Sequence, residues 1–203
     1  MIDERRLQLA LDRSEIFDLI AQSIVSRDSG LWDELAECYH SQAELNSSWW
    51  SGDPSNFIPA AKAKLEAARA AGGEQKHMTS NYWIEINGDV AVAECDLILY
   101  MRSHVRGVEL DLNTFSRRLH LLQREGGNWK IVRRFAIYEK DQISAASPND
   151  ELAILPAQAD LNELLSNLVF EGCWSCGDLV EFGFNSVFEF DACDDFGEVV
   201  KAA

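Results

Sequence analysis

The stretch DVAVAECDLILYMRSHV, residues 89–105, has an apolar period of 2 residues, where the preceding chain has a period of 3.6. Three similar runs surround it: KHMTSNYWIEING at 76–88, VELDLNTFSRRLHLLQRE at 108–125 and NWKIVRRFAIYEKDQI at 128–143. The pairs Asn87-Gly88, Arg106-Gly107 and Gly126-Gly127 separate the runs, and such pairs are typical of hairpin turns. The four runs therefore predict a meander of long antiparallel strands.

Helical patterns come before these strands. Residues 4–27 and 54–73 have apolar residues at helical spacing, and the second pattern closes on two glycines. A shorter amphipathic helix is expected over residues 30–39, followed by a short strand within 43–52. Helices followed by an antiparallel meander predict an α+β fold in which a curved sheet wraps around the N-terminal helices.

Charge and composition exclude several classes of protein. The 203 residues carry a net charge of −16, which would repel nucleic acid and anionic membrane surfaces. The first residues, MIDERRLQLAL, are acidic where a signal peptide is basic, and no apolar run approaches about 18 residues. Five cysteines, an odd number, fit free thiols in a reducing compartment. We therefore expect a cytoplasmic protein with neither a nucleic-acid nor a membrane partner.

The acidity is concentrated at the C-terminal end. From residue 151 onward there are eleven acidic residues and one lysine, and the small residues of SAASPND at 144–150 precede them. This predicts a domain over 1–145 and an acidic extension over 146–203. The extension contains CWSC at 173–176 and Cys193, which together lack the fourth ligand of a zinc site. We expect this extension to dock on the domain or on a neighbouring subunit.

One carboxylate stands out in the first helix. Phe17, Ala21, Ile24 and Asp28 follow helical spacing and share one face, so Asp28 lies on an apolar side. A carboxylate turned toward a core needs a partner. The alternative is an N-cap, because Asp28 also precedes the next short helix.

The order and spacing of three short motifs resemble a known superfamily. These are SRDSGLWDEL at 26–35, HMTSN at 77–81 and WKIVRRFAIYE at 129–139. They resemble the superfamily named for nuclear transport factor two. Within it they resemble SnoaL-like domains and the relatives of hexachlorocyclohexane dehydrochlorinase, scytalone dehydratase and bile-acid dehydratase. The resemblance implies a cone-shaped barrel with an apolar pocket.

The resemblance also implies a site. Asp28 and His77 match the catalytic Asp–His dyad of these enzymes, and Arg134 matches an arginine that stabilises negative charge. A neutral imidazole oriented by a carboxylate is a suitable base near pH 7, and it needs neither a metal nor a cofactor. Strand alternation sends Arg133 and Arg134 to opposite faces, and we expect Arg134 to face inward.

Further side chains are candidates for the wall of the pocket. The candidates for substrate binding are aromatic or imidazole side chains from five segments: Trp49, Trp83, Tyr100, His120 and Tyr138. Core packing is the alternative for the aromatic ones. Arg118 and His120 share a strand face, and a satisfied structural cluster is the simpler interpretation of that pair.

Three functions fit these patterns. The first is a cofactor-independent lyase or isomerase that acts by β-elimination on a small hydrophobic cyclic molecule. The second is a non-catalytic ligand-binding or scaffolding domain of the same fold. The third is a polyketide-cyclase-like or epoxide-hydrolase-like enzyme that uses other acids, for example Asp96 or Asp111. We also expect a homo-oligomer, a dimer or a trimer.

Overall fold

The computed structural model describes residues 3–47, 49–105 and 108–146. The acidic extension, with its cysteines, lies outside the described residues, so its docking and the boundary near residue 145 stay predictions. Three helices and six strands are described, in this order: α1 Glu4–Ser29, α2 Trp32–Glu37, β1 Tyr39–Ser47, β2 Trp50–Gly52, α3 Pro54–Ala70, β3 Glu74–Asn87, β4 Val90–Val105, β5 Val108–Glu125 and β6 Asn128–Ala145. The predicted α+β class is confirmed.

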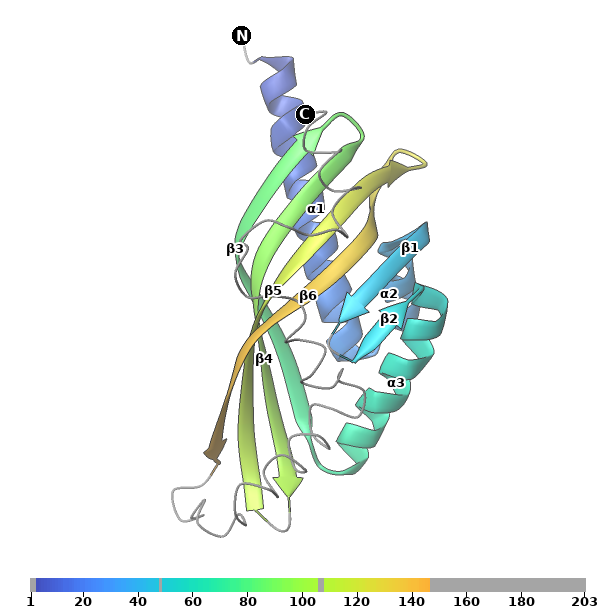
Figure 1. Ribbon diagram of the computed structural model, residues 1–203. Coiled ribbons are helices and arrows are strands. Elements are labelled where there is room, and N and C mark those ends of the chain that lie inside the picture. Colours follow the sequence, from blue (N-terminus) through green and yellow to red (C-terminus); the bar gives the residue numbers. More distant parts are fainter. Residues whose placement is uncertain (1–2, 48, 106–107, 147–203) are drawn as a thin grey trace, which may run out of the picture.

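The strands form one sheet in the order β2-β1-β6-β5-β4-β3. Strands β3 to β6 are the predicted antiparallel meander, and β1 joins it through a parallel pairing with β6. In Figure 1, α1 runs along one face of the twisted sheet, and the long strands extend past the helices. Strands β2 and β3 are the two edges, so the sheet is a curved, open cone and not a closed barrel.

Register shifts accompany the bending of the sheet. They lie between Ser80 and Trp83 in β3, and between Phe115 and Ser116 and between Leu121 and Leu122 in β5. At the first of these, Asn81 has a φ of 53°, a left-handed conformation that asparagine tolerates. Bulges of this kind increase local twist and bend a strand. The curved sheet therefore provides a concave face against which the helices pack.

The core fills the space between α1 and the sheet. On α1 the fully buried apolar residues are Ile16 and Ile20, whereas Phe17 is exposed and contacts the ring of Tyr82. The buried face is thus rotated by about one residue from the predicted one. The other fully buried side chains of this core are Leu35, Leu45, Phe57, Cys95, Leu122 and Ile131.

Helix α1 also buries a charge that the sequence patterns did not indicate. Asp12 is buried and pairs with Arg124 of β5, while Gln8 donates a second hydrogen bond to the same carboxylate at 3.0 Å. The guanidinium of Arg124 stacks over the Trp129 ring, with Cζ 4.5 Å from the ring centroid. This contact fixes the first half of α1 to the sheet.

Replacing Arg124 with methionine is expected to lower the free energy of unfolding by about 2–3 kcal/mol, because the Asp12 carboxylate then stays buried without its cation. Urea unfolding measures this change. Arg102→Met is the matched control: Arg102 forms an exposed pair with Asp111, and its loss should cost less than about 1 kcal/mol. Equal effects of the two substitutions would contradict the structural role of the Asp12–Arg124 pair.

Candidate active site

Asp28 and His77 are in direct contact. His77 Nδ1 lies 2.6 Å from Asp28 Oδ1, and the backbone N–H of His77 donates to Asp28 Oδ2 at 2.7 Å. Asp28 sits in the last turn of α1, before the left-handed cap residue Gly30, and His77 is the fourth residue of β3. The His77 side chain is 3% exposed and the Asp28 side chain 9% exposed. The helix end and the strand start thus hold a carboxylate and an imidazole together through two hydrogen bonds.

The N-cap interpretation of Asp28 is wrong. Helix α2 has Leu31 at its N-cap position, with no side-chain hydrogen bond to the helix. The Asp28 carboxylate instead accepts hydrogen bonds from His77, and its backbone carbonyl accepts one from Arg69 of α3 at 2.9 Å. Asp28 therefore orients His77 and does not cap a helix.

The second ring nitrogen of His77 is also occupied. Arg27 Nη1 lies 2.8 Å from His77 Nε2, and the Arg27 guanidinium lies beside the packed rings of Trp49 and Phe57, with Cζ 5.9 Å from each centroid. An arginine can only donate, so Nε2 accepts here and Nδ1 carries the proton that is donated to Asp28. The contact fixes the tautomer that a general base requires. Sequence reasoning missed Arg27, because a basic residue in the last turn of a helix is typical of favourable interaction with the helix dipole.

The surroundings keep His77 neutral. The pKa of His77 is lowered to about 3: burial and the charges of Arg27 and Arg118 lower it, and they outweigh the contact with Asp28, which raises it. Burial would raise the pKa of Asp28, but its hydrogen bonds to His77 and the nearby charges of His77 and Arg27 outweigh burial and lower it. The pair is therefore a neutral imidazole beside an ionised carboxylate.

Arg134 lies inside the fold, as alternation predicted. It is 3% exposed, its Nη1 donates to the hydroxyl of Tyr39 at 3.0 Å, and its Cζ lies 4.8 Å from the centroid of Phe57. Its Nε has no hydrogen-bond partner among the described residues. Phe57 thus lies against both Arg27 and Arg134.

His120 and Arg118 line the same inner face. His120 is directly opposite Arg134 in the sheet and is fully buried, and Arg118 is two residues earlier on β5. Neither ring nitrogen of His120, nor Nε of Arg118, has a hydrogen bond of ordinary geometry within the described part of the chain. The interpretation of Arg118 and His120 as a satisfied cluster is therefore wrong.

Two buried neutral histidines predict a loss of stability in mild acid. Burial lowers the pKa of His120 to about 3, with Arg118 and Arg134 adding to the effect and the Ala93 backbone opposing it. Between about pH 6.5 and pH 3 the unfolded chain therefore binds more protons than the folded one at His77 and His120, and stability falls as the pH is lowered. The expected loss is about 2 kcal/mol per histidine at about pH 5.

Urea unfolding over that range measures this loss. His120→Leu should remove about half of the pH dependence, because one of the two buried imidazoles is gone. His104→Gln, which removes an exposed ring that pairs with Glu109, is the matched control. A pH dependence that is unchanged in His120→Leu would contradict the burial of a neutral His120.

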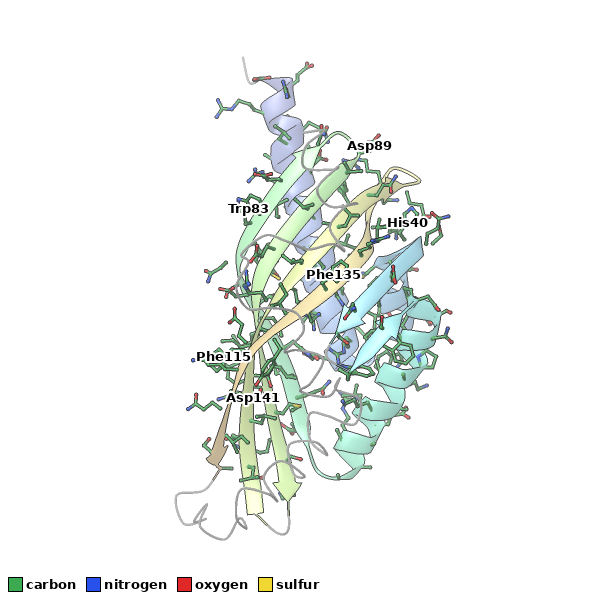
Figure 2. All side chains as sticks on the ribbon, viewed as in Figure 1. His40, Trp83, Asp89, Phe115, Phe135 and Asp141 are labelled. Carbon is green, nitrogen blue, oxygen red and sulfur yellow. The ribbon has the colours of Figure 1, made fainter. Side chains whose placement is uncertain are left out.

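The structure brings one of the predicted aromatic side chains to the site and leaves two away from it. Trp49 packs on Phe57, with ring centroids 5.5 Å apart, and contacts Arg27. Trp83 is 55% exposed on the edge strand β3 (Figure 2), and Tyr100 pairs with Lys76 and not with His77, so it points to the other face.

The other proposed groups are placed as follows. Tyr138 is opposite Ser116 and shares its face with Arg134, but it is 43% exposed. Of the alternative acids, Asp96 accepts a hydrogen bond from Asn81 and Asp111 pairs with Arg102, both outside the site. Neither acid contacts His77, so the structure does not support the epoxide-hydrolase-like alternative.

One hollow lies near the site without including it. It has a volume of about 410 Å³ and lies between the C-terminal end of α3 and the start of β3; its lining residues are Leu65, Arg69, Gly72, Gly73, Glu74 and Gln75. Among the described residues, no three His, Cys, Asp or Glu side chains are placed to hold a metal ion. Within the described ranges, no helix combines the length and apolar character that crossing a bilayer requires.

Two fungal proteins resemble this chain in sequence over about 70% of its length. A PEP2-like protein of Fusarium vanettenii is 29% identical over 144 residues, which are 70% of this chain and 60% of that protein. Pea pathogenicity protein 2 of the same fungus is 27% identical over 144 residues, 69% of this chain and 60% of that protein. The chain thus spans about 60% of the length of these relatives.

Solved structures and a family model agree on the fold. A hexachlorocyclohexane dehydrochlorinase, LinA type 2, superposes with a TM-score of 0.60 at 17% identity, covering 72% of this chain and 98% of its own. At this identity the likeness concerns the fold alone. The model of the SnoaL-like domain matches residues 8–135, which include Asp28, His77 and Arg134. The chain therefore belongs to the SnoaL-like domain family.

Proposed function

We propose that the chain is a cofactor-independent lyase or isomerase that removes a proton from carbon with His77 as the base and Asp28 as its orienting partner. The observation that carries this proposal is the double hydrogen bond between Asp28 and His77, which makes Nε2 the unprotonated ring nitrogen. A substrate is expected to be a small, largely apolar, cyclic molecule, because Phe57 and Trp49 lie beside the site.

The proposed reaction is a β-elimination. His77 Nε2 takes a proton from a carbon, the C–H electrons form the new double bond, and the neighbouring hydroxyl or halogen departs with its bonding electrons. Asp28 stabilises the imidazolium that forms, a role that orienting carboxylates have in acid–base pairs. Arg134 is the group proposed to stabilise the departing anion or a developing enolate. The proton then passes from His77 to the leaving hydroxide or to solvent.

In this reaction Arg27 has to leave Nε2 before the base can act. Arg27 Nη1 donates a hydrogen bond to that nitrogen in the absence of substrate, so the electron pair of Nε2 is not available to accept a proton from a substrate. A change of side-chain rotamer would expose it, and such changes are fast compared with typical turnover. Arg27 is therefore a positioning residue in the proposal and not the base itself.

Relatives of known activity support the reaction class. LinA type 2 is described as a hexachlorocyclohexane dehydrochlorinase, an enzyme that removes hydrogen chloride from a ring. The fold similarity extends over 72% of this chain. A homo-oligomeric state and a cytoplasmic location are further predictions that go with this proposal.

An assay of a panel of cyclic alcohols and halides tests the proposal. Product formation is followed by mass spectrometry, and exchange of the carbon-bound hydrogen with solvent deuterium detects proton abstraction even where the leaving group stays. The proposal requires at least one compound to react with the wild type and not with His77→Gln. Reaction at the same rate in both proteins would exclude His77 as the base.

The hydrogen bond from Arg27 to His77 Nε2 favours one alternative, a non-catalytic binding domain. If Arg27 stays on Nε2 when a ligand is bound, then His77 cannot accept a proton and the pair has a structural role. In that case ligands would raise the thermal stability of the protein, but no member of the panel would exchange deuterium. The same assay therefore separates the two functions.

A further inference from the structure

Two buried arginines and a half-buried one lie in the region of the His77 imidazole. The arginine cluster consists of Arg27 from the end of α1, Arg118 from β5 and Arg134 from β6. Arg118 and Arg134 are both nearly inaccessible to solvent, and the charges of the three side chains act on one another. Among the described residues, Asp28 is the one carboxylate whose charge affects the pKa of both His77 and Arg27. Among these groups, Asp28 is thus the one negative charge beside three positive ones.

The unsatisfied donors of this region point the same way. Nε of Arg118, Nε of Arg134 and the one N–H of the neutral His120 ring lack an acceptor among the described residues, and the other ring nitrogen of His120 is an acceptor without a donor there. These atoms come from two adjacent strands, because His120 is directly opposite Arg134 and Arg118 precedes His120 by two residues. A buried donor without an acceptor costs about 1–3 kcal/mol, and more when it is charged. Several such donors at one place indicate a missing acceptor.

The cost of the cluster is also visible in its acid–base properties. Burial, together with the charges of Arg134 and Arg27, lowers the pKa of Arg118 to about 9. Burial, followed by the charge of Arg134, lowers the pKa of Arg27 to about 10. Fold stability alone does not explain this arrangement, because apolar residues at such positions are usually at least as stable.

We propose that Arg118 and Arg134, assisted by His120, bind a carboxylate group of an organic substrate. This inference rests on the proposed function, since it identifies the class of substrate on which His77 would act. A carboxylate presents two oxygens in one plane, which matches the fork of a guanidinium better than a single halide ion does. One negative charge, together with Asp28, nearly balances the three positive charges of the arginine cluster.

The aromatic neighbours restrict the rest of the molecule. Phe57 lies against Arg134 and Arg27, and Trp49 packs on Phe57. These rings offer apolar area beside the proposed carboxylate position, so a cyclic or aromatic acid fits the chemistry of both parts. A phosphate dianion would lose more hydration on entering such a site, and a carboxylate is therefore favoured.

A bound carboxylate would also prepare His77 for catalysis. It would compensate the charges of Arg27 and Arg118, which disfavour the imidazolium form of His77. It would also offer Arg27 an acceptor other than His77 Nε2. Substrates that carry the carboxylate would therefore expose and strengthen the base, and neutral analogues would not.

Calorimetric titration of the full-length protein with benzoate and with benzamide tests the inference. The two probes have the same size and ring, but only benzoate is charged. We expect benzoate to bind the wild type at least about 10-fold more tightly than benzamide, and Arg118→Met to lose about 10- to 100-fold of the benzoate affinity. Arg102→Met, at an exposed pair, is the matched control and should bind benzoate like the wild type.

Three results would overturn the inference: equal affinity for benzoate and benzamide, full benzoate affinity in Arg118→Met, or inorganic phosphate or chloride competing with benzoate at equal concentration. Circular dichroism checks the fold of Arg118→Met, and Arg118→Gln replaces it if that variant does not fold.

The test of the carboxylate site is separable from the test of the proposed function, because benzoate binding is measured without turnover. If the protein catalyses deuterium exchange but binds benzoate no more tightly than benzamide, the carboxylate site alone is overturned. If it binds benzoate more tightly but catalyses no exchange on any compound of the panel, the role of His77 as the base alone is overturned.

Discussion

Replacing His77 with glutamine is expected to lower the rate of proton abstraction by about 10²- to 10⁴-fold on any substrate that the wild type turns over. Glutamine retains a polar side chain that can donate to Asp28 Oδ1, but it has no nitrogen that accepts a proton near pH 7. The measurement is the rate of deuterium incorporation at the reacting carbon, together with product formation. Substrate affinity should change much less than the rate.

Asp28→Asn is expected to lower the same rate by a similar factor. Both oxygens of Asp28 accept hydrogen bonds from His77, one from the ring and one from the backbone, so an amide would have to offer its NH₂ group to one of these donors. The ring would then flip or lose its fixed tautomer, and an imidazolium would no longer face a negative charge. A rate that falls in His77→Gln but not in Asp28→Asn would reduce Asp28 to a structural partner.

Two matched controls make these expectations specific. His104→Gln changes an exposed histidine on β4 that pairs with Glu109, and Asp96→Asn changes an acid that bonds to Asn81 at the sheet surface. Both variants should turn over substrate at the wild-type rate. A loss of activity in Asp96→Asn would instead favour the alternative in which another acid performs the chemistry.

Periodicity was sufficient to predict the architecture. The change from a 3.6-residue to a 2-residue period near residue 74 marks the boundary between α3 and β3, and the glycine turns mark the ends of the β3–β4 and β5–β6 hairpins. The turn at 106–107 lies outside the described residues. Periodicity could not predict whether the sheet closes, because closure depends on how strands far apart in sequence pair.

A bulge explains why Trp83 does not line the site. Counted in steps of two, Trp83 shares a face with His77, and Ile84 would be on the opposite face. The register shift after Ser80 places three residues of β3 against two of β4, so Ile84 turns to the core and Trp83 to solvent. A single left-handed residue, Asn81, accompanies this reversal, and its conformation is set by the folded sheet.

The charged part of the site was only partly predictable. Asp28 and His77 are 49 positions apart, and resemblance brought them together where composition could not. Alternation correctly turned Arg134 inward and placed Arg118 beside His120. Alternation could not show that Nε of Arg118 and Nε of Arg134 lack hydrogen-bond acceptors. Whether a buried N–H group finds an acceptor depends on atoms from several helices and strands at once.

Phe57→Ala is expected to lower the free energy of unfolding by about 3–5 kcal/mol, the usual loss for a large aromatic side chain in a core. Phe57 is fully buried in α3, and its ring contacts the two tryptophans of the β1–β2 region, at 5.5 Å from Trp49 and 6.3 Å from Trp50. Urea unfolding measures the loss. Phe17→Ala is the matched control: this ring is exposed and contacts Tyr82 alone among the described rings, so its removal should cost about 1 kcal/mol or less.

Phe57→Leu separates the packing role of this residue from its role at the site. Leucine retains most of the buried apolar volume, and it should cost about 1–2 kcal/mol. It has no aromatic face, however, and two guanidinium groups lie against that face, with Cζ of Arg134 at 4.8 Å and Cζ of Arg27 at 5.9 Å from the centroid. Because each contact of this kind is worth about 0.5–2 kcal/mol, their loss should reduce benzoate affinity and deuterium exchange several-fold in a protein that is still folded. Wild-type affinity and exchange in Phe57→Leu would show that packing volume alone positions the two arginines, and that the aromatic ring adds nothing to the site.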